Sequence, residues 1–579
     1  MIRKMSNKKT QGILMAAAMS FNLLNTVAIQ MPKNFTADAL LHNIKQNEAK
    51  PETYTAACCK ALHFADGLFF GTAEAAKTQD VNSGENIDGG SVGDGQTYTI
   101  QNVHDGGTTT KENVENGGEQ NLKGGTTVET EIKAGGVQNV SGGSSEKTSV
   151  YGELNITNGK VMDVKIYNGG VENVKGGLTK NGEIYAGGVQ NVEGGTVENI
   201  LISKGGIQNI KAGQAKGGCV FEGGVQNIQG GTADNVQVCK GGVQNFQSGF
   251  GNNIYVYDGG TQNIEGGTVT GTNIKIKGIQ NITGGIADKT LVNGIQNIEG
   301  GKATNTQISK GGVQNVKSGE AAVNYINNGG TQNIEGGAAG DNIIYAGGVQ
   351  EITAGTATNN TVYGIQNVNG GTAATNIVNA GGVQNVNDGT VLNTAIEENG
   401  SQVISGGVVS ETTINGGSQT IHTGQVNGTV INEGSQVVLD GQVKGTTLKG
   451  GSQVISGGVV SETTINGGSQ EVHAGQVSDT IINAGIATYQ DGTIKTTTLN
   501  NGTANFQNGT IQDTTINAGT ANFQSGNVQD TTINGGTTNL QGGSIQDTTI
   551  NGGTTNLQGG NIDNTTIKDG SVNVENDKV

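Results

Sequence analysis

The sequence predicts an all-β solenoid, in which a short repeated unit coils along one axis. Glycine contributes 102 of the 579 residues, whereas there are only two prolines and no tryptophan. β-Branched residues are abundant, and they recur at a regular interval. Glycine-rich chains without such an interval are usually disordered. The periodicity therefore indicates a folded repeat array.

From about residue 97 to the end, one unit recurs about 28 times, at intervals of 16 to 19 residues. A clear copy spans residues 187–202, and its glutamine, Gln190, defines position 0. Position +2 is apolar or aromatic throughout, and position +12 is Val, Ile or Leu in almost every copy. Each unit is therefore predicted to hold two short strands with inward residues at +2 and +12. Position +10 has the parity of +12 and is also predicted to face inward.

Glycine pairs after each predicted strand indicate the turns, because glycine adopts backbone angles that cost other residues energy. The changes in repeat length fall in the second turn, which leaves the inward positions in register. One unit cannot bury its own apolar side. Stacking units at ~4.8 Å buries it and gives a rod of ~130 Å.

Two rival solenoids fit the spacing less well. A left-handed hexapeptide helix needs apolar residues six apart, but here the spacing alternates between ten and about eight. Calcium-binding nonapeptide repeats need a glycine–aspartate series, and only residues 89–94 match that series in part.

The chain is predicted to have three segments. Residues 1–39 have a basic start and an apolar stretch typical of an export signal, with cleavage at Ala39 or as late as Ala75. A membrane anchor is the alternative interpretation of this segment. Residues 40–96 are expected to be a leader or linker, and residues 97–579 form the repeat domain. No later stretch is apolar enough to cross a membrane as a helix.

Charge and cysteine content exclude several classes of protein. The net charge is −17 and Arg3 is the only arginine, so we expect no nucleic-acid partner. Cys219 and Cys239 lie two positions out of register in neighbouring repeats. Their Cα atoms would be roughly 8 Å apart between straight strands, beyond disulfide reach. These two residues and the adjacent pair Cys58 and Cys59 are all predicted to be free thiols.

Residues 400–414 carry the pattern Gly-x-Gln-x-Ile-x-Gly-Gly followed by Thr-Thr-Ile. This pattern closely resembles the passenger repeats of self-associating autotransporters of the AIDA and antigen-43 type. The resemblance covers about 480 of the 579 residues. It implies a right-handed parallel β-helix, display at the cell surface or secretion, adhesion, and biofilm formation. In some members of the family it also implies sugars on outward Ser and Thr.

In that family a translocator barrel follows the repeats, whereas here the repeats run to Val579. We therefore expect contact with the outer membrane only through a separate or missing translocator.

No pattern indicates catalysis, so we expect no catalytic residue, no metal ligand and no cofactor. The five histidines are scattered and the acidic residues are spread along turns. Enzymes built on this fold use a groove with clustered carboxylates and bases, and short repeated turns leave no room for one. Residues 400–419 and 451–470 are identical, and such duplication suits a rod better than an enzyme.

Several outward positions form regular columns. Position 0 is mostly Gln and position +1 mostly Asn; both are predicted to form amide ladders on polar faces, which either fix register or bind a ligand. In the C-terminal half, Thr at +11 and Asn at +13 raise two further hypotheses, sugar attachment and ice binding. In the N-terminal half, position +13 is aromatic. The candidate contact stripe comprises Tyr151, Tyr167, Tyr185, Phe221 and Tyr257.

The stripe has two interpretations. It is a contact surface for sibling rods or for host or matrix glycans and proteins, or its rings merely cover a strand edge. The first interpretation predicts a bacterial adhesin passenger that works through multivalent contacts along a rod. The alternative is a passive structural or matrix solenoid without a dedicated receptor.

Overall fold

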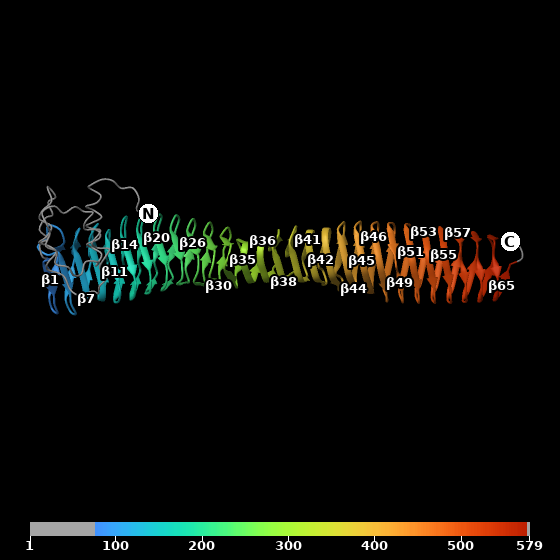
Figure 1. The fold of residues 1–579 in the computed structure, drawn as a ribbon, viewed down its shortest axis with the longest axis horizontal. Coiled ribbons are helices and arrows are strands. Elements are labelled where there is room, and N and C mark those ends of the chain that lie inside the picture. The colour runs from blue at the N-terminus through green and yellow to red at the C-terminus, as the bar shows by residue number, and fades with distance from the viewer. Residues whose placement is uncertain (1–75, 576–579) are drawn as a thin grey trace, which may run out of the picture. The chain divides into compact units, whose positions relative to one another are not determined.

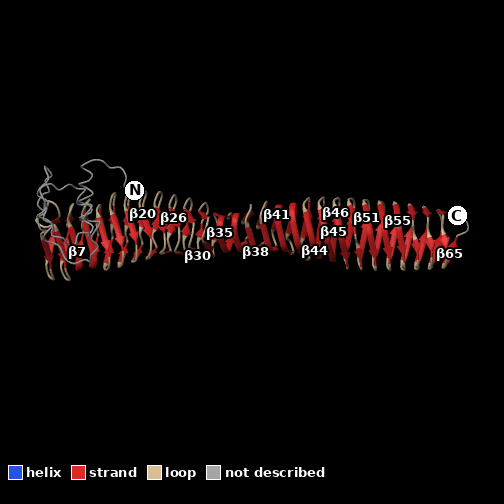
Figure 2. Ribbon diagram, in the orientation of Figure 1, coloured by secondary structure: helices blue, strands red, loops and turns tan. Residues whose placement is uncertain are grey.

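The computed structural model describes residues 76–575, which belong to a unit that spans Ala76–Val579. The predicted export signal and Cys58 and Cys59 lie outside the described residues. Within them, every regular element is a strand, from β1 (Thr78–Val81) to β65 (Ser571–Val574). The 65 strands stack along one axis (Figures 1 and 2), which confirms the all-β solenoid. Right-handedness stays a prediction.

One coil of the solenoid contains β17 (Val189–Val192), β18 (Thr196–Glu198) and β19 (Leu201–Ile202). Each strand pairs in parallel with its equivalent in the next coil, so that Gln190 lies beside Gln208 and Ile202 beside Val220. The register matches the sequence repeat position for position. In part of the rod, consecutive strands merge into longer elements. The longest, of 14 residues each, are β35 (Ile295–Ile308), β36 (Val313–Ile326), β41 (Ile365–Val378), β42 (Val383–Ile396), β44 (Val408–Ile421) and β45 (Gln425–Val438).

The prediction of two strands per coil was wrong, because a sharp bend at position +9 divides the second strand. The residue there has a left-handed backbone conformation, for example Asn199 at φ 54° and Asp513 at φ 56°. Asn, Asp and Gly adopt this conformation more readily than other residues do. The bend separates the strand at +6 to +8 from the one at +11 and +12.

The second turn of each coil lies directly against the equivalent turn of the coil before. A Cβ atom on Gly188 would lie 2.5 Å from the Ile166 carbonyl oxygen, so this position accepts only glycine without a backbone shift. Neighbouring coils can therefore stack closely at this corner.

The solenoid begins upstream of residue 97. Strand β1 pairs with β4 (Ile100–Val103), and Gln79 lies beside Gln101. This coil also contains β2 (Asn86–Asp88) and β3 (Ser91–Val92). Gln79 of this coil and Gln101 of the next are 22 residues apart, a longer interval than any between later repeats. The repeat spacing therefore did not reveal this coil. Part of the segment expected to be a leader or linker is therefore a coil.

Within residues 76–575, no helix is long and apolar enough to cross a membrane.

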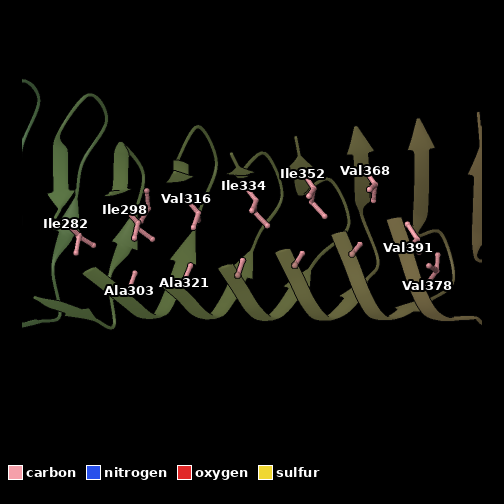
Figure 3. Close-up of a cluster of buried hydrophobic side chains, with 14 of the residues drawn as sticks. Ile282, Ile298, Ala303, Val316, Ala321, Ile334, Ile352, Val368, Val378 and Val391 are labelled. Carbon is pink, nitrogen blue, oxygen red and sulfur yellow. The ribbon is translucent and has the colours of Figure 1, made fainter. Parts of the chain in front are cut away.

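The core is a set of inward columns that run along the rod. Figure 3 shows one column, formed by position +2, at Ile282, Ile298 and Val316. These side chains and Ala303 and Ala321, from position +7, are completely buried. Position +12 is buried along most of the rod, and position +10 is buried as predicted. Position +7 is a further inward column that the sequence analysis did not identify.

The glutamines at position 0 were predicted on a polar face, but they are buried in the core. Position 0 has the parity of position +2, so both point inward from the same strand. The Gln208 amide donates to the Gln190 side-chain oxygen at 2.5 Å, and the Gln314 amide donates to Gln296 at 2.7 Å. Such bonds form an unbroken ladder from Glu172 to Gln470, and the ladder satisfies polar groups that burial would otherwise penalise.

Glu172 ends this ladder because the preceding coil has Leu154 at the equivalent position. Gln190 donates to one carboxylate oxygen at 2.6 Å, and the Thr179 hydroxyl donates to the other at 2.7 Å. A carboxylate needs no acceptor, whereas a glutamine amide would face Leu154 without one. Burial raises the pKa of Glu172 to about 7.

Beyond Gln470 the ladder gives way to stacked aromatic rings. Tyr489, Phe506 and Phe523 occupy position +2 and stack with ring centroids 4.9 and 4.7 Å apart. Position 0 is Ala487, Ala504 and Ala521 in the same coils. The small alanines leave room for the large rings, so the interior stays filled.

Asparagine ladders run along the surface, as predicted for position +1. The Asn191 amide donates to Asn173 at 2.9 Å, and the Asn209 amide donates to Asn191 at 3.1 Å. In the C-terminal half a second ladder occupies position +13, where the Asn517 amide donates to Asn500 at 2.8 Å. In both ladders the amides bond to one another and hold neighbouring coils in register.

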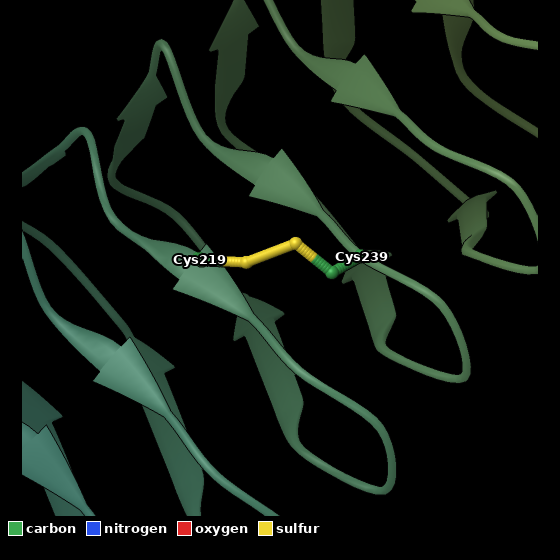
Figure 4. Close-up of a disulfide and its surroundings, with 2 residues drawn as sticks. All are labelled: Cys219 and Cys239. Carbon is green, nitrogen blue, oxygen red and sulfur yellow. A yellow bond between two sulfur atoms is a disulfide. The ribbon is translucent and has the colours of Figure 1, made fainter.

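The prediction of free thiols was wrong for Cys219 and Cys239, which form a disulfide between neighbouring coils (Figure 4). Their Cα atoms are 6.5 Å apart. The strand ends at Val238, and the Gly242 amide donates to the Cys239 carbonyl oxygen, which begins a turn. The distance estimate for straight strands therefore does not apply at this position, and the pair lies within disulfide reach.

Candidate contact surface

The predicted stripe follows the third strand of successive coils. Tyr167 follows β13 (Lys165–Ile166), and Tyr185 follows β16 (Glu183–Ile184). The Tyr185 amide donates to the Ile166 carbonyl oxygen at 2.9 Å, so the backbone ladder continues through position +13. The preceding residue, Ile184, is completely buried. Each aromatic side chain is thus held outward by a buried neighbour and a fixed backbone.

Three of the five predicted residues form one stack. The rings of Tyr151 and Tyr167 are 4.7 Å apart with an interplanar angle of 7°. The rings of Tyr167 and Tyr185 are 4.9 Å apart with an angle of 4°. The rings therefore lie almost parallel, one per coil, and cover one another's faces.

The hydroxyl of the last tyrosine in the stack is hydrogen-bonded to a carboxylate. The Tyr185 hydroxyl donates to Glu183 Oε2 at 2.7 Å. This hydrogen bond to a negative group raises the pKa of Tyr185 to about 12, because loss of the proton would place two negative charges side by side. The hydroxyl therefore remains protonated at neutral pH.

Phe221 and Tyr257 belong to the same column but not to the stack. Ser203 separates Tyr185 from Phe221, and Cys239 separates Phe221 from Tyr257. Phe221 is 41% exposed. The stripe is therefore a three-ring stack followed by two single rings, each preceded by a gap of one coil.

The structure adds apolar residues that the sequence analysis did not include. Tyr255 lies beside Tyr257, with centroids 6.4 Å apart, and the Lys275 ammonium is 6.0 Å from the centre of the Tyr255 ring. Leu201, at position +11, and Ile276, in the turn after the third strand of its coil, are also exposed. Position +11, which carries Leu201 and Tyr255, has the outward parity of +13, so the alternation could have revealed it.

A second pair of exposed rings lies further along the rod. Tyr345 and Tyr363 occupy the same column in consecutive coils, with ring centroids 6.5 Å apart. Both are about 40% exposed, so the rod has a second exposed aromatic pair in the same column, with its rings further apart than in the stack.

Among residues 76–575, no group of three or more His, Cys, Asp or Glu side chains is placed to hold a metal ion. The surface also has an open hollow lined by Asn376, Thr394 and Thr412. It lies far along the chain from the tyrosine stack and is not part of the candidate contact surface.

Comparisons with known proteins give little further information. No family model matches the chain, and no curated protein matches it. One similar solved structure is a TibC-catalyzed hyper-glycosylated TibA fragment, which is 27% identical. The match covers 57% of this chain and 96% of that fragment, with a TM-score of 0.21. At this TM-score the match supports no argument about fold or function.

Proposed function

We propose that this protein is an adhesin-like rod, displayed at the cell surface or secreted, that mediates adhesion or self-association. The observation that carries the proposal is the outward aromatic column on a long, regular β-solenoid. Aromatic side chains supply much of the binding energy in protein interfaces, and soluble proteins seldom expose them in rows.

The architecture suits contacts that are individually weak. Equivalent positions recur once per coil, so a partner aligned with the rod meets many similar surfaces in succession. Once the first contact forms, each further contact is intramolecular, and the summed affinity exceeds that of any single one. Sibling rods and host or matrix glycans or proteins are the partners of this proposal, and no nucleic acid is expected because the net charge is −17.

The same proposal assigns the protein an extracellular location and no enzymatic activity. Disulfides persist in oxidising compartments and are rare in the cytosol, so the bond between Cys219 and Cys239 supports export. In enzymes, catalytic groups converge in a pocket or groove, and the short, regular turns of the described coils favour a rod without one.

A passive matrix rod is the second candidate. The observation in its favour is that the glutamine and asparagine ladders bond to themselves and leave few side-chain groups free for a ligand. On this interpretation the stacked tyrosines only cover a strand edge.

Display of the chain on non-aggregating bacteria distinguishes the two functions. Cell settling and adhesion to glycan-coated surfaces are measured, with bacteria that display an unrelated β-solenoid as the control. The adhesin proposal predicts settling or adhesion above the control. Equal values for the two strains, at equal surface density, would contradict it and favour the passive rod.

A further inference from the structure

We propose that the gap at Ser203, between Tyr185 and Phe221, binds one pyranose ring of a neutral glycan. This inference rests on the proposed adhesive function and names the partner of its contact surface.

The first argument is the thickness of the gap. Within the tyrosine stack each ring occupies one coil, with centroids 4.7 and 4.9 Å apart. Ser203 takes the place of the next ring, and Phe221 follows one coil later. Tyr185 and Phe221 are thus two coils apart, or ~9.6 Å between their backbones. This separation is twice the spacing of the stack, which is the separation that one ring inserted between two others requires.

The second argument is the chemistry of the floor. The Ser203 hydroxyl donates to Glu183 Oε1 at 3.4 Å, while Glu183 Oε2 accepts the Tyr185 hydroxyl. Leu201, which is 38% exposed, lies two residues before Ser203 on the same outward face. The gap therefore combines an aromatic face and apolar surface with a carboxylate and a hydroxyl at its base.

A pyranose ring matches this combination, because its C–H faces are apolar and its edge carries several hydroxyls. The faces would contact Tyr185 and Phe221, and an edge hydroxyl would donate to the Glu183 carboxylate. A protein with a net charge of −17 repels acidic sugars, so a neutral glycan is favoured. An aromatic side chain of a second copy would fill the gap but would bring at most one polar group to the base.

The gap at Cys239 differs from the one at Ser203. The Cys239 sulfur is bonded to Cys219, so it provides neither a hydroxyl nor a carboxylate at the base. Tyr257, on the far side of that gap, lies against Tyr255. The proposed sugar site is therefore limited to Ser203.

The test is ligand-observed saturation-transfer NMR, with the full chain and methyl glycosides of neutral hexoses and N-acetylhexosamines. The wild-type protein should transfer saturation to at least one of these sugars, which would show that the sugar binds. Ser203→Tyr should fill the gap by extending the stack and should lower affinity at least tenfold, which corresponds to about 1.4 kcal/mol.

Ser309→Tyr is the matched control, because Ser309 occupies the same column between Asn293 and Asn327, and it should bind as the wild type does. Glu183→Gln should weaken binding with the stack intact.

Absence of binding by the wild type, or equal binding by Ser203→Tyr, would overturn the proposal. Concentration-dependent association that Ser203→Tyr abolishes, without sugar binding, would assign the gap to a second copy and would also overturn it. Adhesion by displayed cells separates this inference from the proposed function. If wild-type cells adhere and Ser203→Tyr cells adhere equally, only the sugar site fails. If wild-type cells do not adhere, the proposed function fails.

Discussion

Single residues at position +9 set the bend that gives each coil its third strand. Asn, Asp and Gly occupy most of these left-handed positions, but Val323 does so at φ 56°. A β-branched side chain is strained in this conformation, because its Cβ substituents crowd the backbone. Val323 is therefore a point of stored strain, as are the β-branched Thr375 and Thr496 at the same position of other coils.

Val323→Asn should stabilise its coil by about 1 kcal/mol, because asparagine adopts the left-handed conformation at lower cost. Native-state hydrogen exchange of the amides in β36 measures the change. Asn305→Val is the matched reverse substitution one coil earlier, where Asn305 has φ 52°, and it should be destabilising by a similar amount. Unchanged exchange in both variants would contradict the assignment of strain.

Glu172 should make its part of the rod less stable as pH rises. Its pKa is about 7 in the folded chain, against an ordinary value of 4.5. Below pH 4.5 the group is protonated in both states, so its contribution is fully present. Between 4.5 and 7 only the unfolded chain loses the proton, and stability falls by roughly 3 kcal/mol before levelling off.

Hydrogen exchange of the coils around β14 (Val171–Val174) and β17, followed from pH 4 to pH 8, tests this prediction after correction for intrinsic exchange rates. Glu172→Gln removes the titration and should flatten the profile across that range. A variant that keeps the wild-type slope would show that another group is responsible.

The disulfide could not be predicted from residue spacing alone. It depends on the exact path of the backbone after position +12, where the strand ends and a turn begins. The repeat pattern placed Cys219 and Cys239 in neighbouring coils but gave only a straight-strand distance between them.

At the scale of the strand, the inward columns were predictable wherever they are apolar. Positions +2 and +12 stand out because Val, Ile and Leu recur there, and they form the core. Position 0 was misplaced because glutamine is polar, although its parity with +2 already implied an inward side chain. The third strand was missed because +6 to +8 is short and variable, and because the bend at +9 has no fixed residue: Asn, Asp, Gly, Lys, Glu, Thr and Val all occur there.

Because the glutamine ladder is buried, we expect substitutions of the inward residues of a strand to be more destabilising than substitutions of its outward residues. Gln314→Leu would leave the Gln296 side-chain oxygen and the Gln332 amide without partners in the core. The expected cost is about 2–4 kcal/mol, because buried polar groups without hydrogen bonds are penalised. Protection of the neighbouring coils against hydrogen exchange measures the change.

Asn315→Leu is the matched control on the other face of the same strand. Asn315 also bonds to both neighbouring coils, at 2.9 Å, but water can reach its partners. The substitution should cost less than about 1 kcal/mol. Equal destabilisation by the two substitutions would contradict the assignment of the glutamine ladder to the core.

At the scale of the whole molecule, the solenoid places identical backbone positions at regular intervals along one axis. Residues 400–419 and 451–470 are identical and occupy equivalent positions three coils apart. The fold thus multiplies a surface without altering it, and this property connects the architecture to multivalent contact.

Because we propose that the protein is exported, we expect the disulfide between Cys219 and Cys239 to be fully formed in the mature protein. Protein recovered from the cell surface or the medium should yield a peptide that links Cys219 and Cys239, identified by mass spectrometry after digestion without reductant. The same chain retained in the cytosol should have both thiols free, because the cytosol keeps thiols reduced. A linked peptide in the cytosolic chain alone would argue against the proposed location.

The most direct test of the adhesive role replaces the aromatic column on displayed rods. A variant that combines Tyr151→Ser, Tyr167→Ser, Tyr185→Ser and Tyr257→Ser is compared with the wild type by cell settling and surface adhesion. Circular dichroism of the purified variant and equal surface density verify that the solenoid is intact. The account predicts that adhesion falls at least tenfold, because the multivalent contacts are lost together. Unchanged adhesion by an intact variant would contradict it and would leave the tyrosines as a cover for the strand edge.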